Sequence, residues 1–163
     1  VDATFEIQLR TVLSEGWHEV EHDLRYKCKD SWDDHQDLSR ILNGVWANLS
    51  NCDWDLNNLF NEMSYRNYKG KKWSDMIRNK FKIRINGINI SSALNEYMCE
   101  NLDFSKKIFR INRERFISDI YRKKISVPIT YDNIIFLCNL MHINNDDILA
   151  LTPNAIKEQF KWE

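Results

Sequence analysis

Only four glycines and two prolines occur among the 163 residues, and this scarcity is the strongest constraint on the fold. Tight turns, collagen and flexible linkers are all rich in glycine or proline. A turn-rich sheet, a collagen and a flexible linker are therefore poor interpretations of this chain. Six Trp and eight Phe argue against disorder, because large aromatic side chains need a core to cover them. The composition therefore predicts a mainly helical chain.

The first 29 residues combine two periodicities. Residues 3–10 alternate apolar and polar side chains, which predicts a half-buried strand whose polar face carries Glu6, Gln8 and Arg10. Thr11 can cap a following helix that runs to about residue 29. The apolar stripe of that helix consists of Leu13, Trp17, Val20 and Leu24. We expect Trp17 to lie in a core, and the strand to be an edge strand or to pair with residues 81–85 or with a second molecule.

The remaining apolar spacings predict more helices. Residues 38–63 form one long helix, or two that divide at residues 51–53, and a loop follows at 65–72. Ser74 caps the next helix, although residues 81–85 also alternate like a short strand, and Ser91 or Ser92 begins another. A basic amphipathic helix is expected over 105–124, and the last helices are expected near 134–141, at 148–149 and after Thr152–Pro153.

Charge is unevenly distributed although the net charge is only −1. Residues 1–62 hold 5 basic and 13 acidic side chains, whereas residues 63–125 hold 16 basic and 6 acidic ones. Such a basic segment can attract RNA or another acidic partner, or can simply solvate helix faces. No apolar run approaches the roughly 20 residues of a membrane span, so we expect no membrane partner, and we expect no DNA partner.

Four cysteines lie far apart and form no CxxC pair. They are Cys28, Cys52, Cys99 and Cys138. We interpret them as buried thiols of a cytoplasmic protein rather than as disulfides or zinc ligands.

One short motif suggests zinc. His18-Glu19-Val20-Glu21-His22 fits HExxH, in which the two histidines bind the metal and the first glutamate acts as the base. A third ligand is required, and the next histidine, His35, lies too far along the chain. A zinc hydrolase is therefore the weakest of the enzyme interpretations.

A longer string includes the same histidine. In order, it contains Glu6, Gln8, Arg10, Thr11, Trp17, Glu21, His22, Tyr26 and Lys27. It resembles the end of the synthetase domain of RelA/SpoT-type (p)ppGpp synthetases, where Glu-x-Gln-(Ile/Leu)-Arg-Thr on a strand precedes Trp, Glu-His and Tyr-Lys on a helix. The fold implied is an N-terminal strand of a nucleotidyltransferase-like synthetase sheet followed by a helical bundle. Residues 1–66 would complete the synthetase domain, and residues 67–163 would form a helical extension.

The resemblance implies a GTP pyrophosphokinase of the stringent response, which transfers pyrophosphate from ATP to the 3′-hydroxyl of GDP or GTP. Glu6 would be the catalytic ligand of Mg²⁺, since hard cations prefer carboxylate oxygens. Gln8 and Arg10 would orient ribose or phosphate on the same strand face. His22, Tyr26 and Lys27 would contact the nucleotides from the next helix. A homo-oligomer is compatible with this family.

The resemblance is incomplete. The family's second metal-binding Asp, its ATP-binding Arg and Lys residues and its guanine-stacking Tyr belong before Val1 and have no counterpart in this chain. We therefore expect the chain alone to be inactive. The alternative function is a helical regulatory or interaction module that binds protein or RNA through residues 63–125.

Overall fold

The computed structural model describes residues 11–160, and every described element is a helix. The predicted strand at residues 3–10, with Glu6, Gln8 and Arg10, lies outside the described residues. The chain divides into two compact units, residues 1–59 and 60–163. We describe each by itself, although helix α2 contributes to both. The division expected from the resemblance, after residue 66, stays a prediction.

The first unit is a helical hairpin, a term used here for residues 11–59. Helix α1 (Val12–Glu19) continues directly into a π-helix, η1 (Val20–Tyr26), and a short 3-10 turn, η2 (Lys29–Ser31), leads to helix α2 (Gln36–Lys69). Thr11 caps α1 as predicted, in a reciprocal capping box with Ser14. The helix expected over residues 11–29 is therefore present, with its second half wound as a π-helix.

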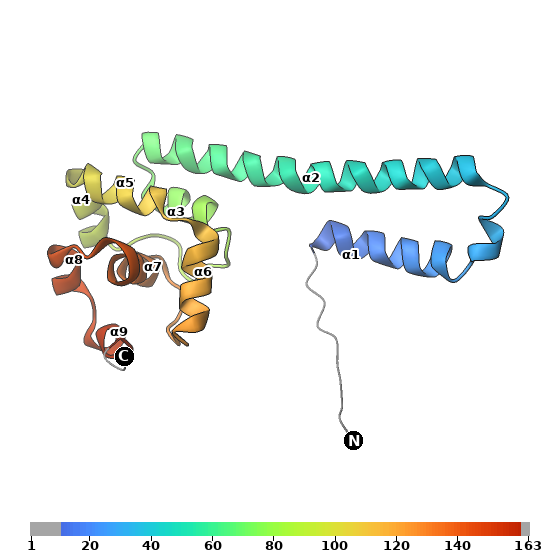
Figure 1. Ribbon diagram of the computed structural model, residues 1–163. Helices are drawn as coiled ribbons and strands as arrows, with labels where there is room; N and C mark the ends of the chain where they lie inside the picture. The colour runs from blue at the N-terminus through green and yellow to red at the C-terminus, as the bar shows by residue number, and fades with distance from the viewer. Residues whose placement is uncertain (1–10, 161–163) are drawn as a thin grey trace, which may run out of the picture. The chain divides into compact units, whose positions relative to one another are not determined.

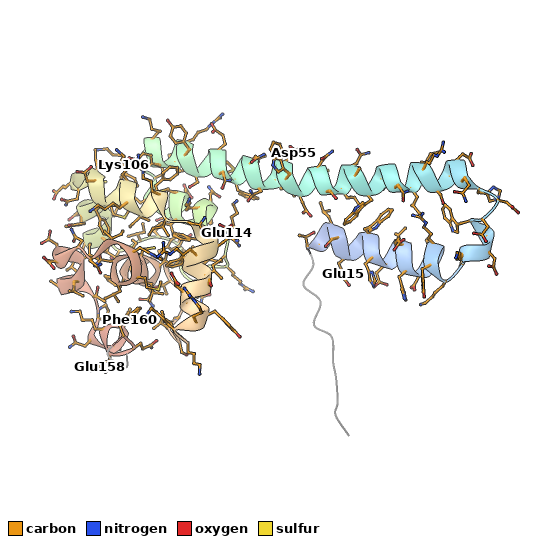
Figure 2. The ribbon with its side chains drawn as sticks, in the orientation of Figure 1. Glu15, Asp55, Lys106, Glu114, Glu158 and Phe160 are labelled. Atoms are coloured by element: carbon orange, nitrogen blue, oxygen red, sulfur yellow. The ribbon has the colours of Figure 1, made fainter. Side chains whose placement is uncertain are left out.

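Figure 1 shows α1 running antiparallel to the first part of α2, and Figure 2 shows side chains filling the space between the two ribbons. The rings of Trp17 and Trp46 pack with centroids 5.6 Å apart. Thr11 Oγ1 donates a hydrogen bond of 2.7 Å to Asp53 Oδ2. Trp17 is only half-buried, and no described side chain of the hairpin is fully buried. Two helices cannot enclose a core, so much of the apolar stripe stays exposed.

Helix α2 resolves two questions that the sequence left open. It is a single helix of 34 residues, without a break at residues 51–53. The loop predicted at 65–72 is wrong for its first part, because the helix continues to Lys69. Tyr68 stacks on Phe109 with ring centroids 4.9 Å apart, and this contact stabilises the extra helical turn. The chain then turns at Gly70 and at Lys71, whose φ is +53°.

The second unit, residues 60–160, is called the helical globule below. After the end of α2 it contains α3 (Trp73–Phe81), α4 (Ser92–Glu100), α5 (Leu102–Arg110), α6 (Arg113–Arg122), α7 (Tyr131–Cys138), the π-helix η3 (Asn139–Ile143), α8 (Asp146–Leu151) and α9 (Asn154–Glu158). Its largest fully buried side chains come from α3 to α8: Trp73, Met76, Ile77, Phe81, Leu94, Met98, Ile108, Phe116, Ile134, Ile135, Leu137 and Ile148. This set forms one hydrophobic core.

Several predicted boundaries in the globule need correction. The single basic helix over 105–124 is wrong: α5 ends at Arg110, and Asn112 caps a separate helix, α6, by accepting a hydrogen bond of 2.8 Å from the Arg115 amide. Ser74 does not cap α3, since its hydroxyl accepts a bond from the Ile90 amide instead. Ser91 does precede α4.

The short strand considered at residues 81–85 is absent. Phe81 ends α3, Lys82 adopts a left-handed conformation, and the extended pairing nearby is a single parallel bridge between Asn86 and Thr130. The cysteine prediction is also wrong in part. Cys138 is buried and Cys99 is partly buried, but Cys28 and Cys52 are exposed.

Candidate functional site

Three of the six site residues predicted from the sequence lie within the described structure. All three lie in or directly after one helical segment of the hairpin. His22 and Tyr26 belong to η1, and Lys27 follows it directly. The Lys27 amide donates to the His22 carbonyl at 3.1 Å, an i to i−5 bond that marks the wider π turn. Helical segments of this kind are rare and frequently occur at functional sites.

The wide turn aligns rings four residues apart. The imidazoles of His18 and His22 stack with centroids 5.3 Å apart, and His22 and Tyr26 stack at 5.9 Å. Tyr26 is 72% exposed, whereas His22 is half-buried. The three rings form a continuous stack along one face of the helix. We call this stack, with Asp23 and Lys27, the histidine face.

Asp23 ties the charged groups of the histidine face together. Its Oδ1 accepts a hydrogen bond of 2.6 Å from Lys27 Nζ and lies 3.0 Å from His22 Nδ1. The bond from Lys27, and then that from His22, hold the pKa of Asp23 below its usual value. The same bond to Asp23 raises the pKa of Lys27. Both groups are exposed, so the pair orients the lysine more than it stabilises the fold.

The other members of the long string have identifiable partners or lie elsewhere. Glu21 lies 4.0 Å from Arg25, the i,i+4 ion pair that such spacing offers, and Arg25 donates to Asn43 at 2.7 Å. Glu6, Gln8 and Arg10 lie outside the described residues. The structure thus brings His22, Tyr26 and Lys27 together and leaves the other half of the predicted site undescribed.

The zinc interpretation gains no third ligand from the described residues. Within residues 11–160, no group of three His, Cys, Asp or Glu side chains is placed to hold a metal ion. Nδ1 of His22 is directed at Asp23, and the His18 ring stacks on that of His22.

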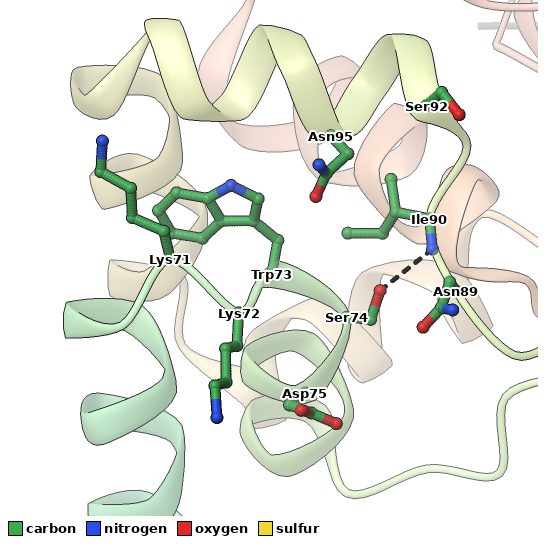
Figure 3. Close-up of a pocket in the computed structure, with 9 residues that line it drawn as sticks. All are labelled: Lys71, Lys72, Trp73, Ser74, Asp75, Asn89, Ile90, Ser92 and Asn95. Atoms are coloured by element: carbon green, nitrogen blue, oxygen red, sulfur yellow. Dashed lines mark hydrogen bonds between the residues drawn. The ribbon is translucent and has the colours of Figure 1, made fainter.

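Sequence reasoning missed a polar cavity of about 350 Å³ in the globule, shown in Figure 3. It lies where the turn after α2, the start of α3 and the start of α4 meet. Lys71, Lys72, Asn89 and Asn95 supply most of its polar side chains. The Trp73 indole beside them is 1% exposed and donates to Cys99 Sγ at 3.2 Å, so it is unavailable for stacking on a ligand. The adjacent lysines were the only sequence signal for this cavity.

Comparison with known proteins identifies no relative: no family model, no curated protein and no solved structure matches the chain. Among residues 11–160, no helix has both the length and the apolar character needed to cross a bilayer.

Proposed function

We propose that this chain is part of an alarmone synthetase, a GTP pyrophosphokinase that transfers pyrophosphate from ATP to the 3′-hydroxyl of GDP or GTP. The observation that carries the proposal is the string from Glu6 to Lys27. The histidine face supports it, because His22, Tyr26 and Lys27, which the string requires, gather on one side of one helix. No other part of residues 11–160 contains residues that the sequence analysis assigned to catalysis.

The residues of the string suit diphosphoryl transfer. Such a reaction concentrates negative charge that a divalent cation must neutralise, and Glu6 is proposed as the carboxylate that binds Mg²⁺. Arg10 and Gln8 would orient phosphate and ribose, with Arg donating through its planar fork. Lys27 and His22 supply donors from the helix. Asp23 holds the Lys27 ammonium in place, at 2.6 Å, beside the His22 ring.

The proposal includes a fold element that completes the hairpin. Residues 3–10 are proposed to form a strand of a synthetase sheet, with residues 1–66 belonging to that domain. The hairpin leaves large apolar side chains open to solvent: Val12 is 87% exposed, Ile41 64% and Trp54 67%. We propose that another part of the protein covers some of these exposed apolar side chains. We propose a cytoplasmic location and the stringent response as the physiological context.

The test uses the full natural protein that contains this chain, with ATP, Mg²⁺ and either GDP or GTP. Anion-exchange chromatography should detect AMP together with guanosine tetra- or pentaphosphate. Glu6→Gln removes a metal ligand without changing the shape of the side chain. It should slow synthesis at least about a hundredfold, since an ion that stabilises the transition state contributes several kcal/mol.

Glu19→Gln is the matched control. Glu19 is an exposed carboxylate of the helical hairpin, and it would be the base of the zinc motif. The synthetase proposal predicts normal activity for Glu19→Gln and near-complete loss for Glu6→Gln. Absence of alarmone from the wild-type protein, or normal synthesis by Glu6→Gln, would contradict the proposal.

A second candidate function concerns the globule. Its hydrophobic core is built from residues 73–156, so this unit has the means to fold by itself. We propose that it is a regulatory extension of the enzyme, and its binding chemistry is considered next.

A further inference from the structure

A cationic cavity of about 450 Å³ lies in the globule where α5 gives way to α6. Its lining residues come from α5, from the α5–α6 corner, from the first turn of α6 and from η3. They are Lys107, Arg110, Ile111, Asn112, Arg115, Met141, His142 and Ile143. Three of these side chains carry a positive charge and none carries a negative one. The volume falls within the range of pockets that hold small organic ligands.

The corner between the helices gathers the three cations. Ile111 has an extended backbone conformation and ends α5, and Asn112 then starts α6. Lys107 and Arg110 therefore come from the last turn of one helix, and Arg115 from the first turn of the next. Cations near the carboxyl end of a helix favour the helix itself, but a cation in the first turn opposes the helix dipole.

The cations are only weakly compensated. Within residues 11–160, no carboxylate lies at ion-pair distance from Lys107 or Arg110. Arg115 Nε lies 3.8 Å from Asp119 Oδ2, while Asp119 Oδ1 is bound by Arg122. Lys107 and Arg110 are thus available to an anion, and Arg115 is only partly neutralised by Asp119. The start of α6 contributes further positive potential.

The lining of the cavity also includes apolar side chains and a histidine. Ile111, Met141 and Ile143 supply hydrocarbon surface beside the cations. His142 is 12% exposed, and its Nε2 lies 3.6 Å from Asp119 Oδ2, beyond hydrogen-bond distance. Burial lowers the pKa of this imidazole, which keeps it neutral near pH 7. A ligand that matches these two kinds of lining side chain has an anionic part and a flat or apolar part.

We propose that the α5–α6 cavity binds a nucleotide, with its phosphates at Lys107, Arg110 and Arg115 and its base or sugar against Ile111, Met141 and Ile143. This inference does not depend on the proposed synthetase activity, because none of these residues belongs to the histidine face.

An extended nucleic acid fits the surroundings poorly. Lys107 also borders a neighbouring cavity, and that cavity presents the carboxylates Glu100 and Asp103. A phosphate backbone that continued past Lys107 would meet these two negative charges, whereas a short ligand would stop before them. The charge pattern therefore favours a compact phosphate ligand over an RNA strand.

The test is a titration of the full chain with ADP, followed by NMR of isoleucine methyl groups. Ile111 and Ile143 line the cavity, and Ile41 in the hairpin serves as an internal reference. ADP should shift the Ile111 and Ile143 signals in a saturable manner. The double variant Lys107→Gln/Arg110→Gln should weaken binding at least about tenfold, because the loss of even one charged hydrogen bond to phosphate lowers affinity by about that factor.

The matched control is Arg84→Gln/Lys106→Gln, which also removes one arginine and one lysine charge, but from exposed positions outside the cavity. It should change the affinity for ADP less than about twofold, and wild-type methyl spectra in both double variants would show that the fold is intact. His22→Ala should leave the Ile111 and Ile143 shifts unchanged, which separates this site from any nucleotide site on the hairpin.

Three results would overturn the proposal. They are an equal loss of affinity in both double variants, an equal affinity for inorganic pyrophosphate and ADP, and the absence of saturable shifts at millimolar ADP. Binding of a 20-nucleotide RNA far more tightly than ADP, through the same cations, would assign the surface to RNA instead.

Discussion

The strongest quantitative prediction concerns Phe116, because the ring lies at the centre of the globule. It is 0% exposed, and its centroid lies 4.6 Å from that of Phe81, within the distance of a favourable aromatic pair. Phe116→Ala removes a ring that neighbouring helices cannot easily replace. Comparable truncations cost about 3–5 kcal/mol, and loss of the pair with Phe81 places this one toward the upper end.

That cost is a large share of the stability of a unit of this size, since domains are typically stable by about 5–15 kcal/mol. With a urea slope of about 1–3 kcal/mol per molar, the unfolding midpoint should fall by roughly 2 M. The indole N–H signal of Trp73, which donates to Cys99, reports on the globule alone and can follow the transition in NMR spectra.

The matched control is Tyr121→Ala on the same helix. Tyr121 is 84% exposed, and a surface change of this kind should alter the free energy of unfolding by no more than about 0.5 kcal/mol. A loss below about 1 kcal/mol for Phe116→Ala, or similar losses for the two variants, would refute the single-core description of residues 60–160.

Three further predictions test other features. In the full natural protein, His22→Ala should slow alarmone synthesis markedly, whereas His18→Ala should change the activation free energy by no more than about 0.5 kcal/mol. If both variants lost all activity and zinc restored it, the zinc hydrolase interpretation would be favoured. Because burial holds the folded-state pKa of His142 below its ordinary value of 6.5, the unfolded chain takes up a proton more readily, so the globule should lose stability as the pH falls below about 6.5 in urea titrations. That loss should be smaller in His142→Gln, and an unchanged pH slope would contradict the assignment. Asn139→Ala should destabilise the globule by about 1–3 kcal/mol in the same titrations, because Asn139 exchanges two buried hydrogen bonds, of 2.8 and 2.9 Å, with the Asn145 backbone; a neutral outcome would show that water replaces them.

Apolar spacing was enough to predict most of the helices and their core. The i,i+4 spacing of Ile77 and Phe81, with Met76 beside them, marks the buried face of α3, and the capping role of Thr11 follows from its side chain alone. These features are local, since a helix of a few turns already determines which of its residues share a face.

Tertiary contacts determined the helix boundaries and side-chain exposures that the sequence left open or predicted wrongly. Asn112 is a good helix cap, but the apolar side chains of residues 105–124 keep a helical spacing across it, so the corner between α5 and α6 was missed. The α2 helix passes Asn51 to Asp53, which favour turns in isolation, because Thr11 bonds Asp53 and apolar residues on both sides remain in register. Exposure of Cys28 and Cys52 follows from the lack of an enclosed core in the hairpin, which no local pattern reveals.

The same distinction applies to the two candidate sites. The proximity of His22, Tyr26 and Lys27 could be predicted because they lie within one short helical segment. The stacking of His18, the bridging by Asp23 and the π geometry that aligns the rings could not. The cationic cavity joins α5, α6 and η3, so its residues become neighbours only after the corner at Ile111 has formed. Within the sequence its lysines and arginines are indistinguishable from those of a solvated helix face. Of the three cations, only Arg115 has a carboxylate at ion-pair distance within the described residues. This convergence of cations beside apolar side chains gives the globule a chemistry separate from that of the hairpin.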